Sequence, residues 1–590
     1  MTLLKKIDSP YDLKKLSLDE MKTLAQEIRE GILNRVNKIG GHCSPNLGIV
    51  EATIALHYVF NSPVDKFIFD VSHQCYTHKM LTGRKSGFVG DIIKNISGFF
   101  NPNESEHDTF VLGHTSTSLS LASGVAKARD INGDNYNVIA LIGDGSLSGG
   151  EAFEGLNNAA MLNSNFIIIV NDNEMSISEN QGGLYKNLRE LRESNGTCQN
   201  NFFKTFGYDY HYLDEGNDLE KLIELFSQAK DTTKPVVLHI HTLKGNGYTP
   251  AEENKEMFHN TVSGRINGKT PVIPANLPET YGNITTDFIL KKREKDKSIV
   301  AITAATPGGV SFTKDFRQKM GDAYIDVAIS EEHAMGFTSG LAKNGAKPIF
   351  AVQSSFVQRT YDQISQDIAL NNSPVTVVVY CGGMSGIDMT HLGTFDISMI
   401  SNIPNVVYLA PTNKEEYLSM LDWSIEQVEH PVFIRVPLGE PVVTGKKDKT
   451  NYSNLNKYQV VEKGSEIAIV ALGTFFQLGE KVVSRLKQAG FNPTLINPKY
   501  ITGLDEDLLE GLKDNHNLVI TLEDGILDGG FGQKIASFYG DSDMKVLNYG
   551  GKKEFTDRTK VTDLYERYHL TPELIFEDVM KQQSGKLLYA

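Results

Sequence analysis

The sequence predicts an α/β protein built from three consecutive α/β domains with mostly parallel sheets. Short apolar runs alternate with segments of helical periodicity along nearly the whole chain. A length of 590 residues is more than one hydrophobic core normally serves. With 40% hydrophobic and 22% charged residues, the composition is that of an ordinary globular protein.

The stretch 138–178 shows the alternation most clearly. An apolar run over 138–142 breaks at the turn residues 143–145, a helix-like segment follows, and a second apolar run over 166–170 breaks at 171–173. Two short apolar runs joined by a helix are typical of a parallel βαβ unit whose strands are buried on both faces.

Polar residues stand where both predicted strands end. Ligands of parallel sheets bind beyond the carboxyl ends of the strands, where Asp144 and Asn173 fall. Their side-chain oxygens and the main-chain carbonyl of Met175 suit octahedral Mg²⁺, with two diphosphate oxygens and a water completing the shell. Gly143 and Gly145 let the backbone approach the phosphates. A Gly-Asp-Gly turn alone is common, so the prediction depends on the pairing of the two motifs.

The same alternation extends on both sides of this unit. A helix is predicted over 17–39 with Ser17 as its N-cap, then a helix over 49–58 and a buried strand over 67–71. Further along we expect a small-residue helix after the turn 113–118, a polar surface excursion after Asn180, a strand at 206–210, a helix at 218–230, a strand at 235–242 and a loop at 244–259.

Two more α/β blocks follow. Strand candidates lie at 298–304, 324–330, 348–353, 374–380 and 406–411 in the second block, and at 467–472, 492–498 and 518–524 in the third. We place the first domain at 1–264, a polar linker at 265–286, the second domain at 287–450 and the third at 451–590.

Composition excludes several classes of function. The net charge of -15 argues against a nucleic-acid partner and gives no sign of membrane-surface binding. No stretch has the character of a signal peptide or a membrane span. The 4 cysteines include no CxxC pair, so neither a disulfide framework nor a zinc site is predicted, and we expect a cytoplasmic protein.

The paired motifs GDG and NDN resemble the thiamin-diphosphate motif of the transketolase superfamily. NDNEMSISEN resembles its 1-deoxy-D-xylulose-5-phosphate synthase branch. The resemblance implies two thiamin-diphosphate-binding folds, a diphosphate- and Mg-binding domain at 1–264 and a pyrimidine-binding domain at 287–450. A transketolase C-terminal-like domain would follow. It also implies thiamin diphosphate and Mg²⁺ as cofactors and a homodimer.

By this resemblance Glu331 matches the family's glutamate, which hydrogen-bonds the aminopyrimidine N1′ of the cofactor. Glu332 stands beside it, so the register stays open by one residue. Phe356 matches the ring that stacks on the pyrimidine. The remaining cofactor-binding residues implied are His73, Gly113, His114, Thr115, Ser116, Thr117, Gly143, Asp144, Gly145, Ser146, Asn173, Lys244 and His259.

The resemblance also implies the groups that act on substrate. His42 and His391 match active-site histidines that exchange protons with carbonyl and hydroxyl oxygens, although a histidine taken alone is usually structural. Arg359 and Arg435 match positions that bind the acceptor's phosphate, and Asp388 matches one near its hydroxyls. Of these and the cofactor residues, His42, Glu331, Arg359 and His391 are the expected catalytic groups.

Four departures from the family pattern fall on the acceptor side. Gln353 replaces an aromatic residue, Cys381 and Leu438 replace arginines, and Met389 occupies a glycine position. The segment after Asn180 is also shorter than the family norm. These departures predict a weaker or altered preference for a phosphorylated acceptor.

The activity implied is a transferase that condenses pyruvate with glyceraldehyde 3-phosphate, with loss of carbon dioxide, to 1-deoxy-D-xylulose 5-phosphate. That product would feed isoprenoid and thiamin biosynthesis. Three alternatives stay open at this point. One is a related transferase with a ketose donor or another aldehyde acceptor, another is a dehydrogenase E1-type subunit that needs a lipoyl partner, and the last is a cofactor-binding paralogue without turnover.

Overall fold

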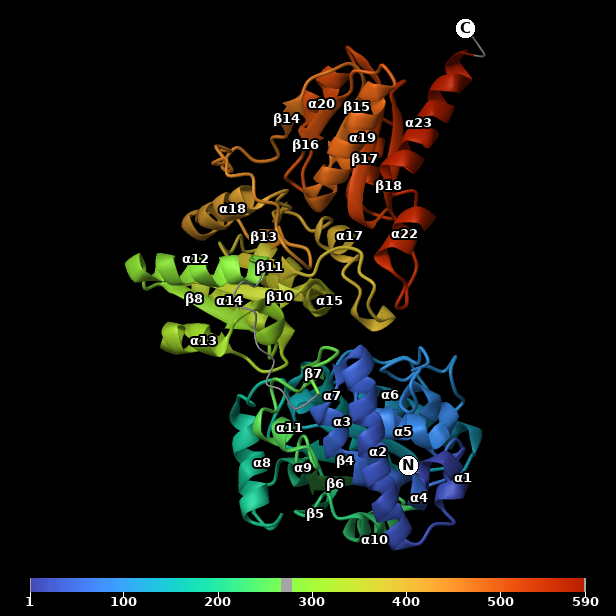
Figure 1. Ribbon diagram of the computed structural model, residues 1–590. Helices are drawn as coiled ribbons and strands as arrows, with labels where there is room; N and C mark the ends of the chain where they lie inside the picture. The colour runs from blue at the N-terminus through green and yellow to red at the C-terminus, as the bar shows by residue number, and fades with distance from the viewer. Residues whose placement is uncertain (1, 267–278, 588–590) are drawn as a thin grey trace. The chain divides into compact units, whose positions relative to one another are not determined.

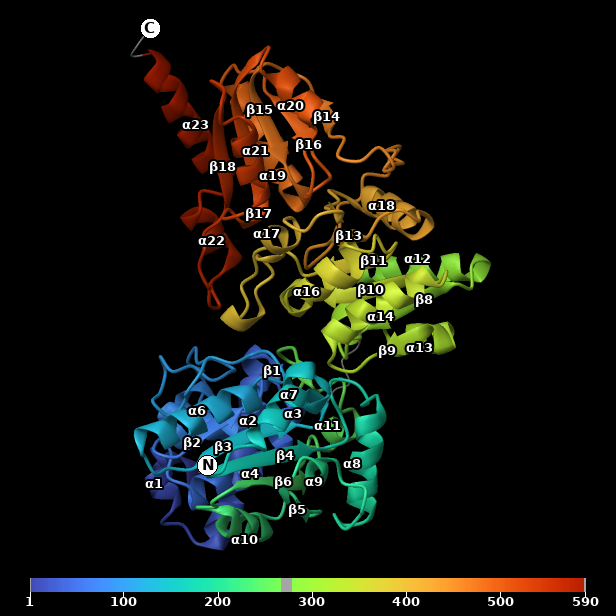
Figure 2. The ribbon, with the colours of Figure 1, turned by 180° about the vertical axis from the view of Figure 1, so that it is seen from behind.

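The computed structural model describes residues 2–266 and 279–587 (Figure 1). The chain divides into two compact units, residues 1–275 with 328–330, and residues 276–327 with 331–590. Each unit is built from parallel β-sheets with helices packed on them (Figures 1 and 2). The predicted α/β class with mostly parallel sheets is therefore confirmed.

The first unit contains a five-stranded, all-parallel sheet in the order β2-β3-β4-β6-β5. Its strands are β2 (Lys66–Phe69), β3 (Val138–Gly143), β4 (Phe166–Asp172), β5 (Asp209–Leu213) and β6 (Pro235–His241). A short antiparallel pair joins β1 (Gly41–His42) to β7 (Asn260–Thr261). The helices are α1 (Pro10–Leu13), α2 (Leu18–Ile39), α3 (Ser44–Gly48), α4 (Val50–Val59), α5 (Tyr76–Lys79), α6 (Ser118–Asn132), α7 (Gly150–Ala159), α8 (Gly183–Glu193), α9 (Phe202–Thr205), α10 (Leu219–Ala229) and α11 (Thr249–Glu253).

Burial on both faces explains why the central strands read as unbroken apolar runs. Ile139 and Leu141 of β3 belong to a hydrophobic cluster formed with α2, α4 and α10. Ala140 and Ile142 belong to a second cluster formed with α6 and α7. Successive side chains of a strand point to opposite faces, so the two clusters cover the two faces of the sheet.

Most predicted elements of the first unit lie within a residue or two of their expected bounds. The helix capped by Ser17 is α2, which begins with a capping box formed by Ser17 and Glu20. The strand predicted at 67–71 ends earlier, at Phe69, and Val71 already has a positive φ of 59°. The segment after Asn180, expected to be a polar surface excursion, contains helix α8, which has a buried face. The expected loop 244–259 likewise contains α11.

The second unit contains two sheets. The first is all-parallel in the order β12-β13-β11-β10-β8-β9. The second, in the order β14-β16-β15-β17-β18, is parallel except for the antiparallel edge strand β14. The strands are β8 (Ile299–Thr303), β9 (Tyr324–Asp326), β10 (Lys347–Gln353), β11 (Thr376–Tyr380), β12 (Val407–Leu409), β13 (Val432–Arg435), β14 (Gln459–Glu462), β15 (Glu466–Ala471), β16 (Thr494–Asn497), β17 (His516–Ile526) and β18 (Lys545–Gly551).

Helices cover both sheets of this unit (Figure 2). They are α12 (Tyr281–Lys295), α13 (Lys314–Met320), α14 (Glu331–Lys343), α15 (Ser354–Val357), α16 (Tyr361–Gln363), α17 (Asp396–Ile400), α18 (Lys414–Glu426), α19 (Phe476–Gln488), α20 (Glu506–Leu512), α21 (Phe531–Phe538), α22 (Val561–Arg567) and α23 (Pro572–Leu587). One hydrophobic cluster holds Phe350 and Val377 of the first sheet together with Val470 and Val519 of the second. This shared core explains why the second and third α/β blocks form one compact unit.

Three strands, the end of a fourth and one boundary differ from the sequence prediction. The strand expected at 324–330 is β9, which ends at Asp326. Strands β13, β14 and β18 were not predicted. Helix α12 begins at Tyr281, so the end of the expected linker 265–286 is helical and belongs to the second block. The linker residues 267–278 lie outside the described residues. Over residues 2–266 and 279–587, no helix combines the length and the apolar character needed to cross a bilayer.

Candidate active site

The tips of β3 and β4 bring the predicted metal ligands to one edge of the first unit's sheet. Gly143 is paired with Asn171 in the parallel ladder, and the Asp144 amide donates a hydrogen bond to the Asn171 carbonyl at 3.1 Å. Asn173 follows two residues later, just past the end of β4. Both predicted ligands are buried, with 1% of Asp144 and 5% of Asn173 exposed. The strand-end arrangement predicted from the sequence is therefore present.

The Asp144 carboxylate lies in an environment that suits a cation. Asn180 Nδ2 donates to its Oδ2 at 2.7 Å. Burial, reinforced by the charge of Asp172, raises the pKa of Asp144. Burial also lowers the pKa of Lys244, whose ammonium donates to the main-chain carbonyl of Ser176. A divalent cation would relieve the desolvation of Asp144 more completely than this one lysine does.

The described side chains at this sheet edge do not form a metal site whose ligands all come from the protein. Among the described residues, no group of three or more His, Cys, Asp or Glu side chains is arranged to hold a metal. The Asn173 Oδ1 accepts the Met175 amide at 3.3 Å, which turns the chain after β4. The predicted site offers one carboxylate, one amide and one carbonyl, so it suits a magnesium ion that keeps water and phosphate oxygens in its shell.

The turn 113–118 is fastened to both neighbouring loops. The amides of Ser116 and Ser118 donate to the buried Asp70 carboxylate at 2.8 and 3.0 Å. Ser116, whose φ of 73° is left-handed, also donates its hydroxyl to the Ser146 carbonyl at 2.8 Å. A Cβ at Gly149 would come within 2.1 Å of Ser116 Oγ, so glycine is required there. These hydrogen bonds and the close packing at Gly149 hold the turn in place beside the loop after β3.

Three of the histidines identified in the sequence gather in the first unit. The His42 ring lies 5.0 Å from that of His73 and 5.6 Å from that of His259. The β1–β7 pairing places His42 beside His259, and Asn46 Nδ2 donates to the main-chain carbonyls of His42 and His73 at 2.9 and 2.7 Å. Burial lowers the pKa of His259 well below its ordinary value. Phe99, which the sequence did not indicate, lies 5.7 Å from His42.

In the second unit, Glu331 is the first residue of α14 and only 3% exposed. Its Oε2 has no hydrogen-bond partner among the described residues, and the Arg359 guanidinium lies 3.8 Å away. Burial raises the pKa of Glu331 to about 7. Glu332 is only half-buried, so the environment favours Glu331 in the register left open by the sequence.

Phe356 and His391 form a second pair in this unit. Their rings are perpendicular, with centroids 5.8 Å apart. Thr390 Oγ1 lies 2.7 Å from His391 Nδ1 and donates to Asp388 Oδ1 at 3.0 Å. Burial lowers the pKa of His391 to about 4, so this ring is neutral at physiological pH.

Comparison with known proteins identifies the family. The family model described as 1-deoxy-D-xylulose-5-phosphate synthase matches residues 4–199, the transketolase pyrimidine binding domain matches 280–440, and the transketolase C-terminal domain matches 456–575. The 1-deoxy-D-xylulose-5-phosphate synthase of Clostridium tetani is 38% identical, with 97% of this chain and 98% of the relative covered. The chain belongs to the 1-deoxy-D-xylulose-5-phosphate synthase family.

Two further members of the family agree with this assignment. The synthase of Caldanaerobacter subterraneus subsp. tengcongensis is 38% identical, with 98% of this chain and 99% of the relative covered. That of Methylacidiphilum infernorum is 36% identical, with 98% and 97% covered. The family consists of thiamin-diphosphate-dependent transferases that use a divalent metal such as Mg²⁺.

The structure fits the synthase family's cofactor at several atoms. Buried polar atoms without a hydrogen-bond partner among the described residues include Thr117 Oγ1, Asn180 Oδ1 and His259 Nδ1 in the first unit and Glu331 Oε2 in the second. Such atoms are costly unless a ligand or water meets them. A Cβ at Gly145 would press on Ser176 at 3.0 Å, so the loop beside Asp144 is also closely packed.

Arg435 differs from the synthase role expected for it. Its Nε donates to Asp396 at 2.6 Å, its Nη1 pairs with Asp524, and it is only 5% exposed. Two carboxylates around one guanidinium leave the cluster negative, which is unsuited to a phosphate. Arg435 instead ties the end of β13 to α17 and to β17. Leu438, where the resemblance implies a second arginine, is 71% exposed.

The sequence did not indicate several residues that shape the synthase site. Asp70 anchors the turn 113–118, Asn180 contacts Asp144, and Tyr185 and Arg192 of α8 contact the loops after β3 and β4. The helical spacing of Tyr185, Leu188 and Leu191 was the available signal, because these three side chains form the buried face of α8.

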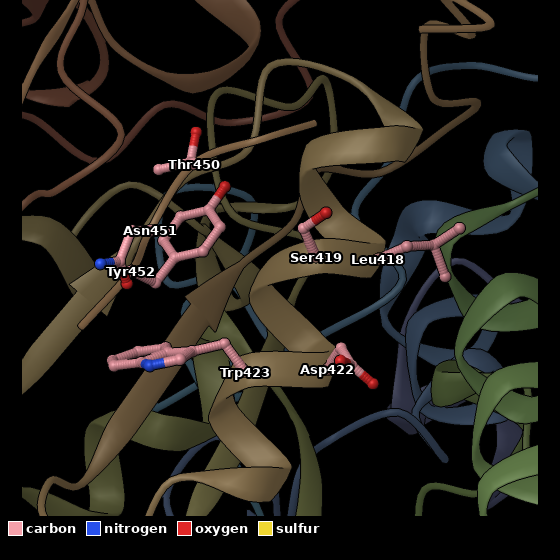
Figure 3. A pocket seen from close by; sticks show the side chains of 7 residues that line it. All are labelled: Leu418, Ser419, Asp422, Trp423, Thr450, Asn451 and Tyr452. Atoms are coloured by element: carbon pink, nitrogen blue, oxygen red, sulfur yellow. The ribbon is translucent and has the colours of Figure 1, made fainter. Parts of the chain in front are cut away.

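Two surface pockets of the second unit contain none of the predicted site residues. One, of about 380 Å³, lies between α18 and the extended segment 450–452, where Trp423 and Tyr452 face each other (Figure 3). The other, of about 480 Å³, is lined mainly by asparagine, serine and apolar residues around 401–407. Neither carries the chemistry of the synthase reaction.

Proposed function

We propose that this chain condenses pyruvate with glyceraldehyde 3-phosphate, with loss of carbon dioxide, to give 1-deoxy-D-xylulose 5-phosphate. The observation that carries the proposal is the buried Glu331: its Oε2 has no hydrogen-bond partner among the described residues and its pKa is raised, as an acid facing a cofactor ring requires. Membership of the synthase family over nearly the full length supports the same reaction.

Thiamin diphosphate, when bound, supplies a nucleophilic carbon that can take up a two-carbon unit. Asp144, Asn173 and the Met175 carbonyl would hold Mg²⁺ and, through it, the diphosphate. Lys244 and His259 would add positive charge and a hydrogen bond on the diphosphate side. The turn 113–118 would present its hydroxyls and amides to the same group.

Glu331 would hold a proton at the aminopyrimidine N1′, because a pKa of about 7 keeps a large share of the carboxyl protonated at neutral pH. Phe356 would stack on that ring. His42 and the neighbouring His73 would move protons at the substrate's carbonyl oxygen. His391, neutral because its pKa is lowered to about 4, would accept a hydrogen bond from an acceptor hydroxyl, and Asp388 would orient that hydroxyl.

Arg359 would bind the acceptor's phosphate. Arg435 is held by two carboxylates, so of the two arginines predicted from the sequence we assign this task to Arg359, which lies 3.8 Å from Glu331. We further propose that the enzyme is cytoplasmic and that it works as a homodimer. Light scattering of the purified protein would test the dimer. A monomer at the concentrations used for activity would contradict the dimer.

The reaction is tested with the purified chain, pyruvate, glyceraldehyde 3-phosphate, thiamin diphosphate and Mg²⁺. We expect release of carbon dioxide from pyruvate and a five-carbon ketose phosphate identified by mass and NMR. Glu331→Gln should lower kcat by at least about 100-fold, while Glu332→Gln, its neighbour, should stay near wild type. Ketose formation without carbon dioxide release, or equal activity of both variants, would refute the proposal.

A further inference from the structure

Helix α8 contacts both strand-end loops that carry the proposed metal ligands. It lies at the edge of the first unit in both views (Figures 1 and 2) and buries Tyr185, Leu188 and Leu191. The segment leading into it carries Asn180, which donates to Asp144. Helix α8 is therefore attached to the sheet edge by its own apolar face and by polar side chains at both ends.

Tyr185 contacts the loop after β3. Its hydroxyl lies 3.2 Å from the main-chain carbonyl oxygens of both Asp144 and Gly145. A phenol hydrogen shared between two consecutive carbonyls restricts the rotation of the peptide that joins them. The Asp144 side chain leaves the chain at that peptide, so Tyr185 constrains the direction in which the carboxylate points.

Arg192, two helical turns further along, contacts the last residue of β4 and the loop that follows it. Its Nη1 lies 2.5 Å from Asp172 Oδ2 and its Nη2 lies 3.1 Å from Glu174 Oε2. These two acids flank Asn173 on either side, so one planar guanidinium holds both neighbours of a proposed ligand. Asp172 is fully buried, and its Oδ2 also lies 2.9 Å from His239 Nε2.

We propose that α8 is a brace that sets the spacing of the two metal-binding loops, with Tyr185 and Arg192 as its positioning residues. The two side chains are seven residues apart, about 10 Å along a rigid helix, so neither loop can move without displacing the other. The brace would act on cofactor and metal binding, because Mg²⁺ tolerates little deviation from octahedral geometry. This inference rests on the proposed magnesium site.

The test measures binding to the cofactor-free full-length protein. Calorimetry gives the Kd for thiamin diphosphate at fixed Mg²⁺, and the electron paramagnetic resonance spectrum of Mn²⁺ in place of Mg²⁺ reports the metal's ligand geometry. We expect Tyr185→Phe to raise the Kd for thiamin diphosphate about 3- to 10-fold, and Arg192→Met to raise it at least about 10-fold. Both should broaden the bound Mn²⁺ spectrum, and kcat at saturating cofactor should fall less than the affinity does.

Two control variants match these changes. Tyr208→Phe removes another buried hydroxyl that donates to a main-chain carbonyl, that of Leu156 at 2.6 Å, within the same hydrophobic cluster. Arg189→Met removes an exposed arginine from the same helix. Neither control should change the Kd or the Mn²⁺ spectrum. Arg192→Lys keeps the positive charge but not the planar guanidinium, so it should restore part of the affinity for the cofactor. This variant also tests the proposal if Arg192→Met fails to fold.

The outcomes separate the brace from the site it serves. If wild type binds Mn²⁺ and Asp144→Asn does not, the proposed metal site stands. The brace is then overturned if Tyr185→Phe and Arg192→Lys both match wild type within twofold. It is also overturned if Tyr208→Phe shifts the spectrum as much as Tyr185→Phe does. If Asp144→Asn binds Mn²⁺ as wild type does, the metal site itself is wrong and the brace falls with it.

Discussion

Glu331 has a raised pKa because its carboxyl leaves water at the first turn of α14, while Arg359, at 3.8 Å, compensates only in part. Its ordinary value is 4.5 and its folded value is about 7. Between these values the folded chain binds more protons at this carboxyl than the unfolded chain does. Stability from this group is therefore fully present below pH 4.5 and is lost as pH rises toward and through about 7.

Glu331→Gln should remove this loss. Relative to wild type, the variant should become more stable as pH rises from 5 to 8, by at most about 3 kcal/mol. Urea unfolding of the cofactor-free protein, followed at both pH values, measures the change. Glu332→Gln is the matched control, because its carboxyl is half-buried and adjacent. A stability difference for Glu331→Gln that does not vary with pH would contradict the burial argument.

The acceptor side depends on single residues as well. Leu438 is exposed and Arg435 is paired internally, and the resemblance implies an arginine where this chain has Cys381. Loss of one charge-assisted contact costs about 1.5–3 kcal/mol, roughly tenfold to a hundredfold in affinity. We therefore expect the ratio of kcat/KM for glyceraldehyde 3-phosphate to that for glyceraldehyde to be lower than in synthases with the full arginine set. A ratio equal to theirs would exclude this effect.

At the scale of elements, the ends of the central strands were predictable, whereas helix α8 and the short strand β13 were not. Strands β3 and β4 are buried on both faces, so their apolar runs mark their length and Asp144 and Asn173 mark their ends. Helix α8 was missed because its three buried residues stand among charged ones. Strand β13 was missed because it is four residues long and ends in Arg435. The partners of Arg435 come from distant elements, α17 and β17, which no local pattern reveals.

The loop before α7 offers a test at this scale. Gly149 precedes α7, and an added methyl group would come within 2.1 Å of Ser116 Oγ. Gly149→Ala should destabilise the protein by about 1–3 kcal/mol through overpacking. Adding Ser116→Gly removes the obstructing side chain at a left-handed φ that glycine accepts, so the double variant should recover at least half of the loss. Additive losses in denaturant unfolding would show that the two residues do not touch.

For the whole molecule, the structure joins the second and third α/β blocks into one unit. They share a hydrophobic cluster, and Arg435 links them through Asp396 and Asp524. Arg435→Met would strand two buried carboxylates, which costs about 3–5 kcal/mol when a buried pair is broken. Hydrogen exchange should then increase over much of 279–587 and stay unchanged in 2–266. Exchange confined to β13 would contradict a shared unit.

The Arg435 cluster also bears on how this chain diversifies. Changing one charge alone leaves an isolated ion in the interior, whereas exchanging all three for apolar groups of similar volume can be tolerated. Positions 396, 435 and 524 should therefore change together among distant relatives rather than drift one at a time. A lineage that lacks the arginine should also lack both acids, and a comparison of gene sequences would show this joint substitution without any purified enzyme.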